Sequence, residues 1–213
     1  MSKKTEVAIF DLDGTMYDLG AASFQTSNLW IQVRDHHLKL ITDIIDTSSP
    51  ESVFLELCER EKTSWKPISM SLAALASKTR QEVFELTWWR LRPSDIITGE
   101  KIIPEFLSEL RQWWLRLVLL TAGPSIWAHK ALEYLGIKIL FDEIITAEMY
   151  SNGKWEVFNK FIADWYFPET IVSIGDQIYS DILPAQGLGI STCHVSGPRD
   201  IYPFFAENIW FKW

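Results

Sequence analysis

Two short apolar runs, residues 7–10 (VAIF) and 171–174 (IVSI), each lead directly into a cluster of acidic residues. Such runs are typical of strands that are buried on both faces of a parallel sheet. Ligands bind parallel sheets beyond the carboxyl ends of the strands, so we expect both clusters to meet at one end of a single sheet. Because neighbouring carboxylates repel one another, their meeting calls for a hard, oxygen-seeking cation such as Mg²⁺. The acidic residues are Asp11, Asp13, Asp176 and Asp181.

The remainder of the chain alternates between strand and helix patterns. This alternation predicts an α/β fold, with a Rossmann-like, mainly parallel sheet that carries helices on both faces. The segment after residue 198 is rich in aromatic residues and carries no clear pattern. Further strands are predicted at residues 117–120, 143–146 and 190–195, and helices at 104–114, 125–135, 153–161 and 181–186.

A helical stretch interrupts this alternation after the first strand. From about residue 21 to 90, apolar residues recur at helical spacing and no comparable strand pattern appears. One helix is predicted to begin at Ser49-Pro50, and a later one to run over residues 72–86. Because the stretch leaves and rejoins the core beyond the strand ends, we expect it to form a cap. The predicted domains are a Rossmann-like core of residues 1–17 and 97–213 and a helical cap of residues 18–96.

Composition restricts the partners of the chain. Its 213 residues, 47% of them hydrophobic, suit one domain or a core with a modest insertion. The formal net charge of −8 argues against duplex nucleic acid, whose affinity comes largely from neutralised phosphates. No apolar stretch approaches the ~18 residues of a membrane helix, and no signal-peptide pattern is present. We therefore expect a cytoplasmic monomer or homodimer with neither a membrane nor a nucleic-acid partner.

Several other residue types have ordinary explanations. Cys58 and Cys193 lack a CxxC spacing and are predicted to be small buried side chains. His36 and His37 match no metal-ligand pattern and are interpreted as solvated helix residues. The eleven tryptophans are interpreted mainly as core packing, with a substrate cavity or a dimer contact as alternatives.

Four motifs occur in a distinctive order along the chain. The series resembles the phosphohydrolases of the haloacid dehalogenase-like (HAD) superfamily over residues 6–20 and about 100–195. The helical insertion resembles the C1 cap of that family in type and position only. The motifs are Asp11-Leu12-Asp13-Gly14-Thr15 after the first strand, Thr121 after the second, Lys154 after a glycine, and Gly175-Asp176 with Asp181 after a later strand.

Chemistry and resemblance together indicate the roles of the first motif. Asp11 is expected to attack phosphorus and form an aspartyl-phosphate, which splits one difficult hydrolysis into two easier steps. Asp13 is expected to act as general acid and then general base, because a crowded acidic site favours a carboxyl that is protonated part of the time. One residue separates the two, so an extended backbone projects both to the same side. Taken alone, both also fit a simple turn.

The resemblance implies the roles of two further positions. Thr121 would hydrogen-bond phosphate together with the backbone amide of Ala122, and Lys154 would neutralise both phosphate and nucleophile. Plainer roles also fit, namely a helix cap for Thr121 and a surface position for Lys154. Trp155 stands where the family usually has proline, and the spacing to the last acidic motif is short, so Lys160 is the alternative lysine.

The resemblance also implies a metal site and a reaction. Asp11, Asp176 and the backbone carbonyl of Asp13 would bind Mg²⁺, while Asp181 would support the ion or orient Lys154. We expect a magnesium-dependent phosphatase for a small phosphorylated metabolite, such as a sugar phosphate or nucleotide, because a closing cap excludes bulky substrates.

Alternative functions share the same residues. A phosphotransferase, such as a sugar-phosphate mutase, would use the same phosphoaspartate, and a catalytically silent phosphate-binding protein would use the same scaffold. Asp13 argues against dehalogenation, since dehalogenases of this superfamily keep no aspartate there. Tyr17 and Asp18 are candidates to line the cleft beneath the cap.

Overall fold

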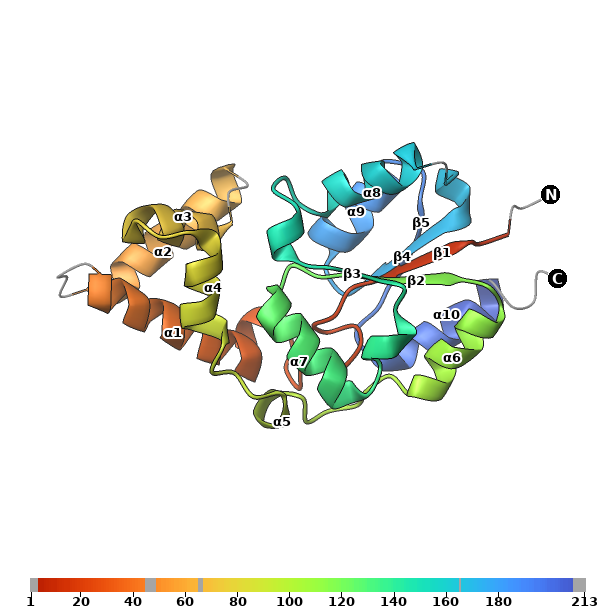
Figure 1. Ribbon diagram of the computed structural model, residues 1–213, viewed down its shortest axis with the longest axis horizontal. Helices are drawn as coiled ribbons and strands as arrows, with labels where there is room; N and C mark the ends of the chain where they lie inside the picture. Colours follow the sequence, from red (N-terminus) through yellow and green to blue (C-terminus); the bar gives the residue numbers. More distant parts are fainter. Residues whose placement is uncertain (1–3, 45–48, 65–66, 165, 209–213) are drawn as a thin grey trace.

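The core of the protein is a five-stranded parallel sheet with the strand order β3-β2-β1-β4-β5 (Figure 1). The computed structural model describes residues 4–44, 49–64, 67–164 and 166–208. Every pairing between neighbouring strands is parallel, which confirms the predicted α/β class. The strands are β1 (Val7–Phe10), β2 (Arg116–Leu120), β3 (Glu143–Ile145), β4 (Ile171–Gly175) and β5 (Ser191–His194).

The described part of the chain contains ten α-helices. Short 3-10 turns lie at Phe24–Thr26, Lys138–Leu140, Ala147–Met149, Pro168–Thr170 and Pro198–Asp200, and a wider π-type turn at Ile178–Ile182. The helices are α1 (Asn28–Ile44), α2 (Pro50–Ser64), α3 (Ile68–Ala76), α4 (Arg80–Trp88), α5 (Pro93–Ile96), α6 (Pro104–Gln112), α7 (Ser125–Leu135), α8 (Lys154–Ala163), α9 (Leu183–Gln186) and α10 (Ile201–Asn208).

Alternate residues of the central strand β1 face two separate hydrophobic clusters. Ala8 and Phe10 belong to the cluster that includes α6, α7 and α10, whereas Val7 and Ile9 belong to the cluster with α8 and α9. Figure 1 shows these two groups of helices on opposite faces of the sheet. A strand covered on both faces is apolar throughout, which explains the uninterrupted run in the sequence. Residues 201–208 of the aromatic segment form α10, and Phe205 stacks on Phe10 with ring centroids 6.2 Å apart.

Helices α1–α4 lie beside the sheet rather than on either of its faces (Figure 1). They share a hydrophobic cluster of their own, which includes Ile41 of α1 and Leu72 of α3. The chain enters this segment at Tyr17 and leaves it at Lys101, where the two residues pair in antiparallel fashion. Within the described ranges, no helix combines the length and hydropathy needed to cross a bilayer.

The helix predicted over residues 72–86 is in fact two helices, α3 and α4. Ser77 ends α3 in a left-handed conformation with a φ of 53°. Thr79 then caps α4, because its Oγ1 accepts a hydrogen bond from the backbone N–H of Glu82 at 3.2 Å. The prediction was wrong because apolar spacing continues across a break that contains neither glycine nor proline. Similarly, the helix predicted over residues 181–186 consists of the end of the π-type turn Ile178–Ile182 and the short helix α9 that follows it.

The structure corrects the interpretations of His37 and of several tryptophans. His37 is not solvated: it is 5% exposed on α1, and its ring lies 5.9 Å from that of Phe54. Core packing accounts for Trp88 and Trp127, which are buried. Three other tryptophans are at least half exposed, so core packing does not explain them: Trp89, Trp114 and Trp155.

Candidate active site

The sheet topology brings the residues that follow three adjacent strands to one place. Because β1 pairs with β2 on one side and with β4 on the other, Asp11, Thr121 and Asp176 emerge at the same end of the sheet. The backbone N–H of Asp11 donates to the carbonyl of Ile174 at 2.9 Å, which ties the first motif to the end of β4. Two acidic motifs from distant parts of the chain therefore share one site.

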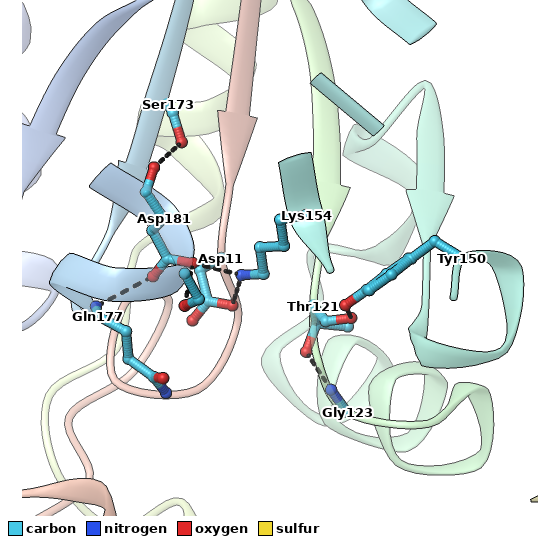
Figure 2. Close-up of polar contacts among 9 residues, drawn as sticks. Asp11, Thr121, Gly123, Tyr150, Lys154, Ser173, Gln177 and Asp181 are labelled. Atoms are coloured by element: carbon cyan, nitrogen blue, oxygen red, sulfur yellow. Dashed lines mark hydrogen bonds and ion pairs between the residues drawn. The ribbon is translucent and has the colours of Figure 1, made fainter. Parts of the chain in front are cut away.

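Lys154 joins these two motifs directly. It is the first residue of α8 and only 5% exposed. Its Nζ contacts both Asp11 and Asp181 (Figure 2), at 2.5 Å from Asp11 Oδ1 and 2.7 Å from Asp181 Oδ1. The alternative lysine, Lys160, is exposed on the same helix. Lys154 is thus the lysine that lies within the acidic cluster.

The Asp181 side chain is held by its own loop. Its Oδ2 accepts from the backbone N–H of Gln177 at 3.0 Å (Figure 2). Its Oδ1 accepts from Ser180 Oγ at 2.9 Å. The hydroxyl of Ser173 in β4 donates to the Asp181 carbonyl at 3.0 Å. A Cβ at Gly175 would overlap the Asp181 carboxylate, so glycine is needed there. These contacts fix the carboxylate that faces Lys154.

Asp176 completes a triad of carboxylates suited to a metal ion. One oxygen from each of Asp11, Asp176 and Asp181 lies within 4.8 Å of the others. Asp176 Oδ1 is buried and has no hydrogen-bond partner among the described residues. Gly14, with a φ of 87°, lies so close that a Cβ there would be 2.6 Å from Asp176 Oδ2. Oxygen donors alone, one of them buried and unsatisfied, fit a hard divalent cation such as Mg²⁺.

Burial changes the protonation of these groups. It raises the pKa of Asp11 well above its usual range, with Lys154 opposing the shift and the other carboxylates adding to it. Burial, followed by the charge of Asp181, raises the pKa of Asp176 to about 7. Burial lowers the pKa of Lys154, but Asp11 and Asp181 outweigh that effect and raise the pKa overall. Lys154 therefore stays charged, and without a cation Asp176 takes up a proton near neutral pH.

The Asp13 carboxylate has different surroundings from that of Asp11. Its Oδ1 accepts hydrogen bonds from the O–H of Tyr17 and from Nε1–H of Trp127, the latter at 2.8 Å. Asp13 is 7% exposed, and burial raises its pKa despite both hydrogen bonds and the charge of Lys154. One carboxylate of the first motif is therefore ion-paired, whereas the other is held by neutral donors.

Thr121 begins the loop after β2. Its Oγ1 accepts from the backbone N–H of Gly123 at 2.9 Å, and its carbonyl accepts from the O–H of Tyr150 at 3.0 Å (Figure 2). Thr121 does not cap the next helix, because the residue before α7 is Pro124. Ala122 beside it is exposed. The Thr121 hydroxyl accepts one hydrogen bond here and keeps its own proton to donate.

A family model for haloacid dehalogenase-like hydrolases matches residues 8–195. The chain belongs to this family. The matched region contains all four motifs and all five strands except the first residue of β1. It also contains the whole helical segment between β1 and β2, so the insertion is part of the family match.

Solved structures of HAD proteins share this fold. The HAD phosphatase of Thermococcus onnurineus superposes with a TM-score of 0.64 at 18% identity, covering 95% of this chain and 97% of that one. The HAD-hydrolase YfnB of Bacillus subtilis, with magnesium bound, gives a TM-score of 0.59 at 18% identity, covering 96% and 99%. At these identities the likeness concerns the fold alone.

A curated relative is more similar over a shorter region. The glyceraldehyde 3-phosphate phosphatase of Methanocaldococcus jannaschii is 35% identical over 92 residues. These residues are 42% of this chain and 40% of the relative. The match thus spans less than half of either protein.

Sequence analysis did not identify three residues at this HAD site or next to it. Nε1–H of Trp127 in α7 donates to Asp13, and the O–H of Tyr150 donates to the carbonyl of Thr121. Arg80 of α4 donates to the carbonyls of Ala147 at 2.5 Å and Tyr150 at 3.4 Å, which joins the helical insertion to the loop after β3. None of the three belongs to a motif. Trp127 and Tyr150 do follow closely after β2 and β3, and aromatic residues near such strand ends were the available signal.

Proposed function

We propose that this HAD protein is a magnesium-dependent phosphatase that hydrolyses a small phosphomonoester through an aspartyl-phosphate on Asp11. The main support is the buried contact of Lys154 with Asp11 and Asp181, close to the carboxylate of Asp176. This arrangement combines a nucleophile, a fixed positive charge and a cation site, which are the elements of phosphoryl transfer. The phosphatase name of the archaeal relative agrees with this proposal.

Asp11, Asp176 and the backbone carbonyl of Asp13 would hold Mg²⁺, and Asp181 would support the ion or orient Lys154. When bound, the ion supplies positive charge that neutralises the carboxylates and the developing charge on the phosphoryl oxygens. Lys154 adds a second positive charge beside Asp11. The Thr121 hydroxyl and the Ala122 amide follow β2, on the other side of β1 from Asp176, and would donate hydrogen bonds to the phosphate.

The first step transfers the phosphoryl group to the protein. An Asp11 carboxylate oxygen attacks phosphorus, and the bond between phosphorus and the leaving oxygen breaks. Asp13 gives its proton to that oxygen, so the substrate leaves as an alcohol. The raised pKa of Asp13, caused by burial, favours the protonated carboxyl that this step needs.

The second step returns Asp11 to its starting state. Water attacks the phosphorus of the aspartyl-phosphate, and the Asp13 carboxylate takes a proton from that water. The bond between phosphorus and the Asp11 oxygen breaks, which releases inorganic phosphate. Asp11 is then a carboxylate again and Asp13 is protonated, so the cycle closes.

We further propose that residues 18–96 form a cap over a core of residues 1–17 and 97–213, and that the leaving group lies between them. A cavity of about 460 Å³ adjoins Asp176 and is lined by residues 18, 19 and 21–25, by residues 176–179 after β4, and by residues 194–196 at the end of β5. The described residues that line it include Asp18, Phe24, Tyr179 and His194 but neither lysine nor arginine. A leaving group without negative charge therefore suits this cavity best.

Phosphate release from a panel of small phosphomonoesters, with Mg²⁺ and with a chelator, tests the proposal. The panel includes glyceraldehyde 3-phosphate, whose leaving group is uncharged, and phosphoglycolate, whose leaving group is anionic. We expect magnesium-dependent release that favours uncharged leaving groups. Asp11→Asn should abolish it, whereas Asp35→Asn, at an exposed position on α1, should not. Equal release by Asp11→Asn would contradict the proposal, and an isomerised sugar phosphate without free phosphate would favour a mutase.

A further inference from the structure

The Asp13 carboxyl is held at one oxygen by two buried donors. Tyr17 O–H and Trp127 Nε1–H both donate to Oδ1. Both donor side chains have no exposed surface, at 0% each. A carboxylate oxygen offers two lone pairs, so these donors occupy Oδ1 and leave Oδ2 for other partners.

The remaining oxygen of Asp13 faces the loop that follows β2. A Cβ placed on Gly123 would lie 3.4 Å from Asp13 Oδ2 and 3.2 Å from Thr121 Oγ1. The absence of that Cβ leaves space beside both oxygens. If Thr121 binds the phosphate, the leaving oxygen of the substrate is within reach of Asp13 Oδ2 in this space.

Both donors are themselves anchored where the helical insertion meets the sheet. Tyr17 pairs with Lys101 at the point where the chain enters and leaves the insertion. Trp127 packs against Trp88 of α4, with ring centroids 6.4 Å apart. The orientation of Asp13 therefore depends on the same contacts that hold the insertion against the core.

We propose that Tyr17 and Trp127 are positioning residues that hold Asp13 so that its Oδ2 delivers the proton to the leaving oxygen. The proposal rests on the phosphatase function proposed above. A carboxyl that loses either donor is free to rotate about its Cβ–Cγ bond, and Oδ2 then spends less time facing the substrate. Because proton transfer depends strongly on donor geometry, this loss should slow bond cleavage wherever the leaving group needs a proton.

A comparison of two substrates with different leaving groups makes the positioning role of Tyr17 and Trp127 measurable. The p-nitrophenolate ion is a weak base that departs without a proton, whereas the alkoxide of glycerol phosphate needs one. The parameter kcat/KM covers events up to the first irreversible step, which here is the transfer to Asp11. A defect in proton delivery therefore lowers kcat/KM for glycerol phosphate much more than for p-nitrophenyl phosphate.

Tyr17→Phe and Trp127→Phe each remove one donor and keep an aromatic ring. For glycerol phosphate we expect each variant to lower kcat/KM about tenfold or more, with a several-fold smaller loss for p-nitrophenyl phosphate. Tyr134→Phe, at an exposed tyrosine on the same helix as Trp127, is the matched control and should keep the wild-type ratio. In an Asp13→Asn background, Tyr17→Phe should cause no further loss, because the proton to be positioned is already gone.

Other results of these assays would count against the positioning role of Tyr17 and Trp127. Equal losses on both esters, or no loss on glycerol phosphate, would overturn the positioning role. If Tyr17→Phe does not fold, as judged by circular dichroism, Trp127→Phe decides alone, and failure of both to fold would make the donors structural. A wild type inactive toward both esters would instead overturn the phosphatase function and the positioning role with it.

Discussion

Nζ of Lys154 lies 2.5 Å from Oδ1 of Asp11, although the two residues are 143 positions apart in the chain. The same ammonium group contacts Asp181, and all three side chains are buried. Removal of one member of such a group leaves an unpaired charge in a low-dielectric interior. The lysine is therefore expected to matter for stability as well as for reaction.

Lys154→Met should lower the free energy of unfolding by about 3 kcal/mol without metal, because Asp11 and Asp181 lose their partner. It should also lower kcat/KM for a phosphomonoester by about 10³-fold, since a fixed charge at the phosphate is lost. Urea unfolding and phosphate-release assays measure the two effects. Lys160→Met, at an exposed position on the same helix, should change neither, and similar effects of both substitutions would contradict the assignment.

Magnesium affinity should weaken as the pH falls. Burial and the charge of Asp181 raise the pKa of Asp176 to about 7 in the metal-free protein. Below that pH a proton occupies the carboxylate and must leave before Mg²⁺ binds, so the apparent affinity should fall up to about tenfold per pH unit. Titration calorimetry at several pH values measures this slope. Asp176→Asn should remove most of the affinity, Asp35→Asn should leave the slope intact, and a flat pH profile in the wild type would contradict the account.

Gly14→Ala should impair the metal site as well as the backbone. Gly14 and Gly20 both have positive φ, 87° and 65°, so alanine at either costs about 1–2 kcal/mol of stability. Only at Gly14 would the new Cβ meet Asp176, 2.6 Å from Oδ2, since nothing lies within 4 Å at Gly20. We therefore expect Gly14→Ala to weaken Mg²⁺ binding and Gly20→Ala to leave it unchanged. Equal Mg²⁺ affinities in the two variants would argue against the close contact.

His37 should make the protein less stable in mild acid. Burial, and then the charge of His36, lowers its pKa in the folded state from 6.5 to about 4. Above pH 6.5 the His37 side chain is neutral in both the folded and the unfolded protein, so it does not reduce stability there. As the pH falls between the two values, the unfolded chain binds a proton that the folded protein does not. The free energy of unfolding should then decrease by about 1.4 kcal/mol per pH unit.

Urea unfolding at several pH values measures this contribution of His37. His37→Leu should remain folded and lack this part of the pH dependence, because an apolar side chain replaces one whose Nδ1 has no hydrogen-bond partner among the described residues. An identical dependence in wild type and variant would show that the histidine titrates normally in the folded protein.

The parts of the fold that were predictable are those with a local signal. The apolar run of β1 predicts a strand that is covered on both faces. The alternation of strands and helices predicts the parallel sheet that brings Asp11 and Asp176 together. The end of α3 at Ser77 had no such signal, because the break depends on a left-handed residue that is neither glycine nor asparagine.

Long-range partners were the main part that could not be predicted. Trp127 lies 114 positions from Asp13. No spacing rule in the sequence predicts that an indole in α7 contacts a carboxylate that follows β1. The burial of His37 likewise follows from the packing of α1 on Phe54, which its own segment does not encode. Lys154 was identified through a motif, and the family resemblance gave its orientation as one of two roles for Asp181, but the 2.7 Å contact itself depends on how α8 packs against the sheet.

The most direct test is to find the phosphoryl group on the protein. Asp13→Asn should accept it from p-nitrophenyl phosphate but release it slowly, because the base for the second step is missing. After an acid quench, mass spectrometry of peptides should find one phosphoryl group on Asp11 when Mg²⁺ is present and none when it is chelated. Magnesium-dependent phosphate release without any modification of Asp11, or with the modification on another residue, would contradict the account.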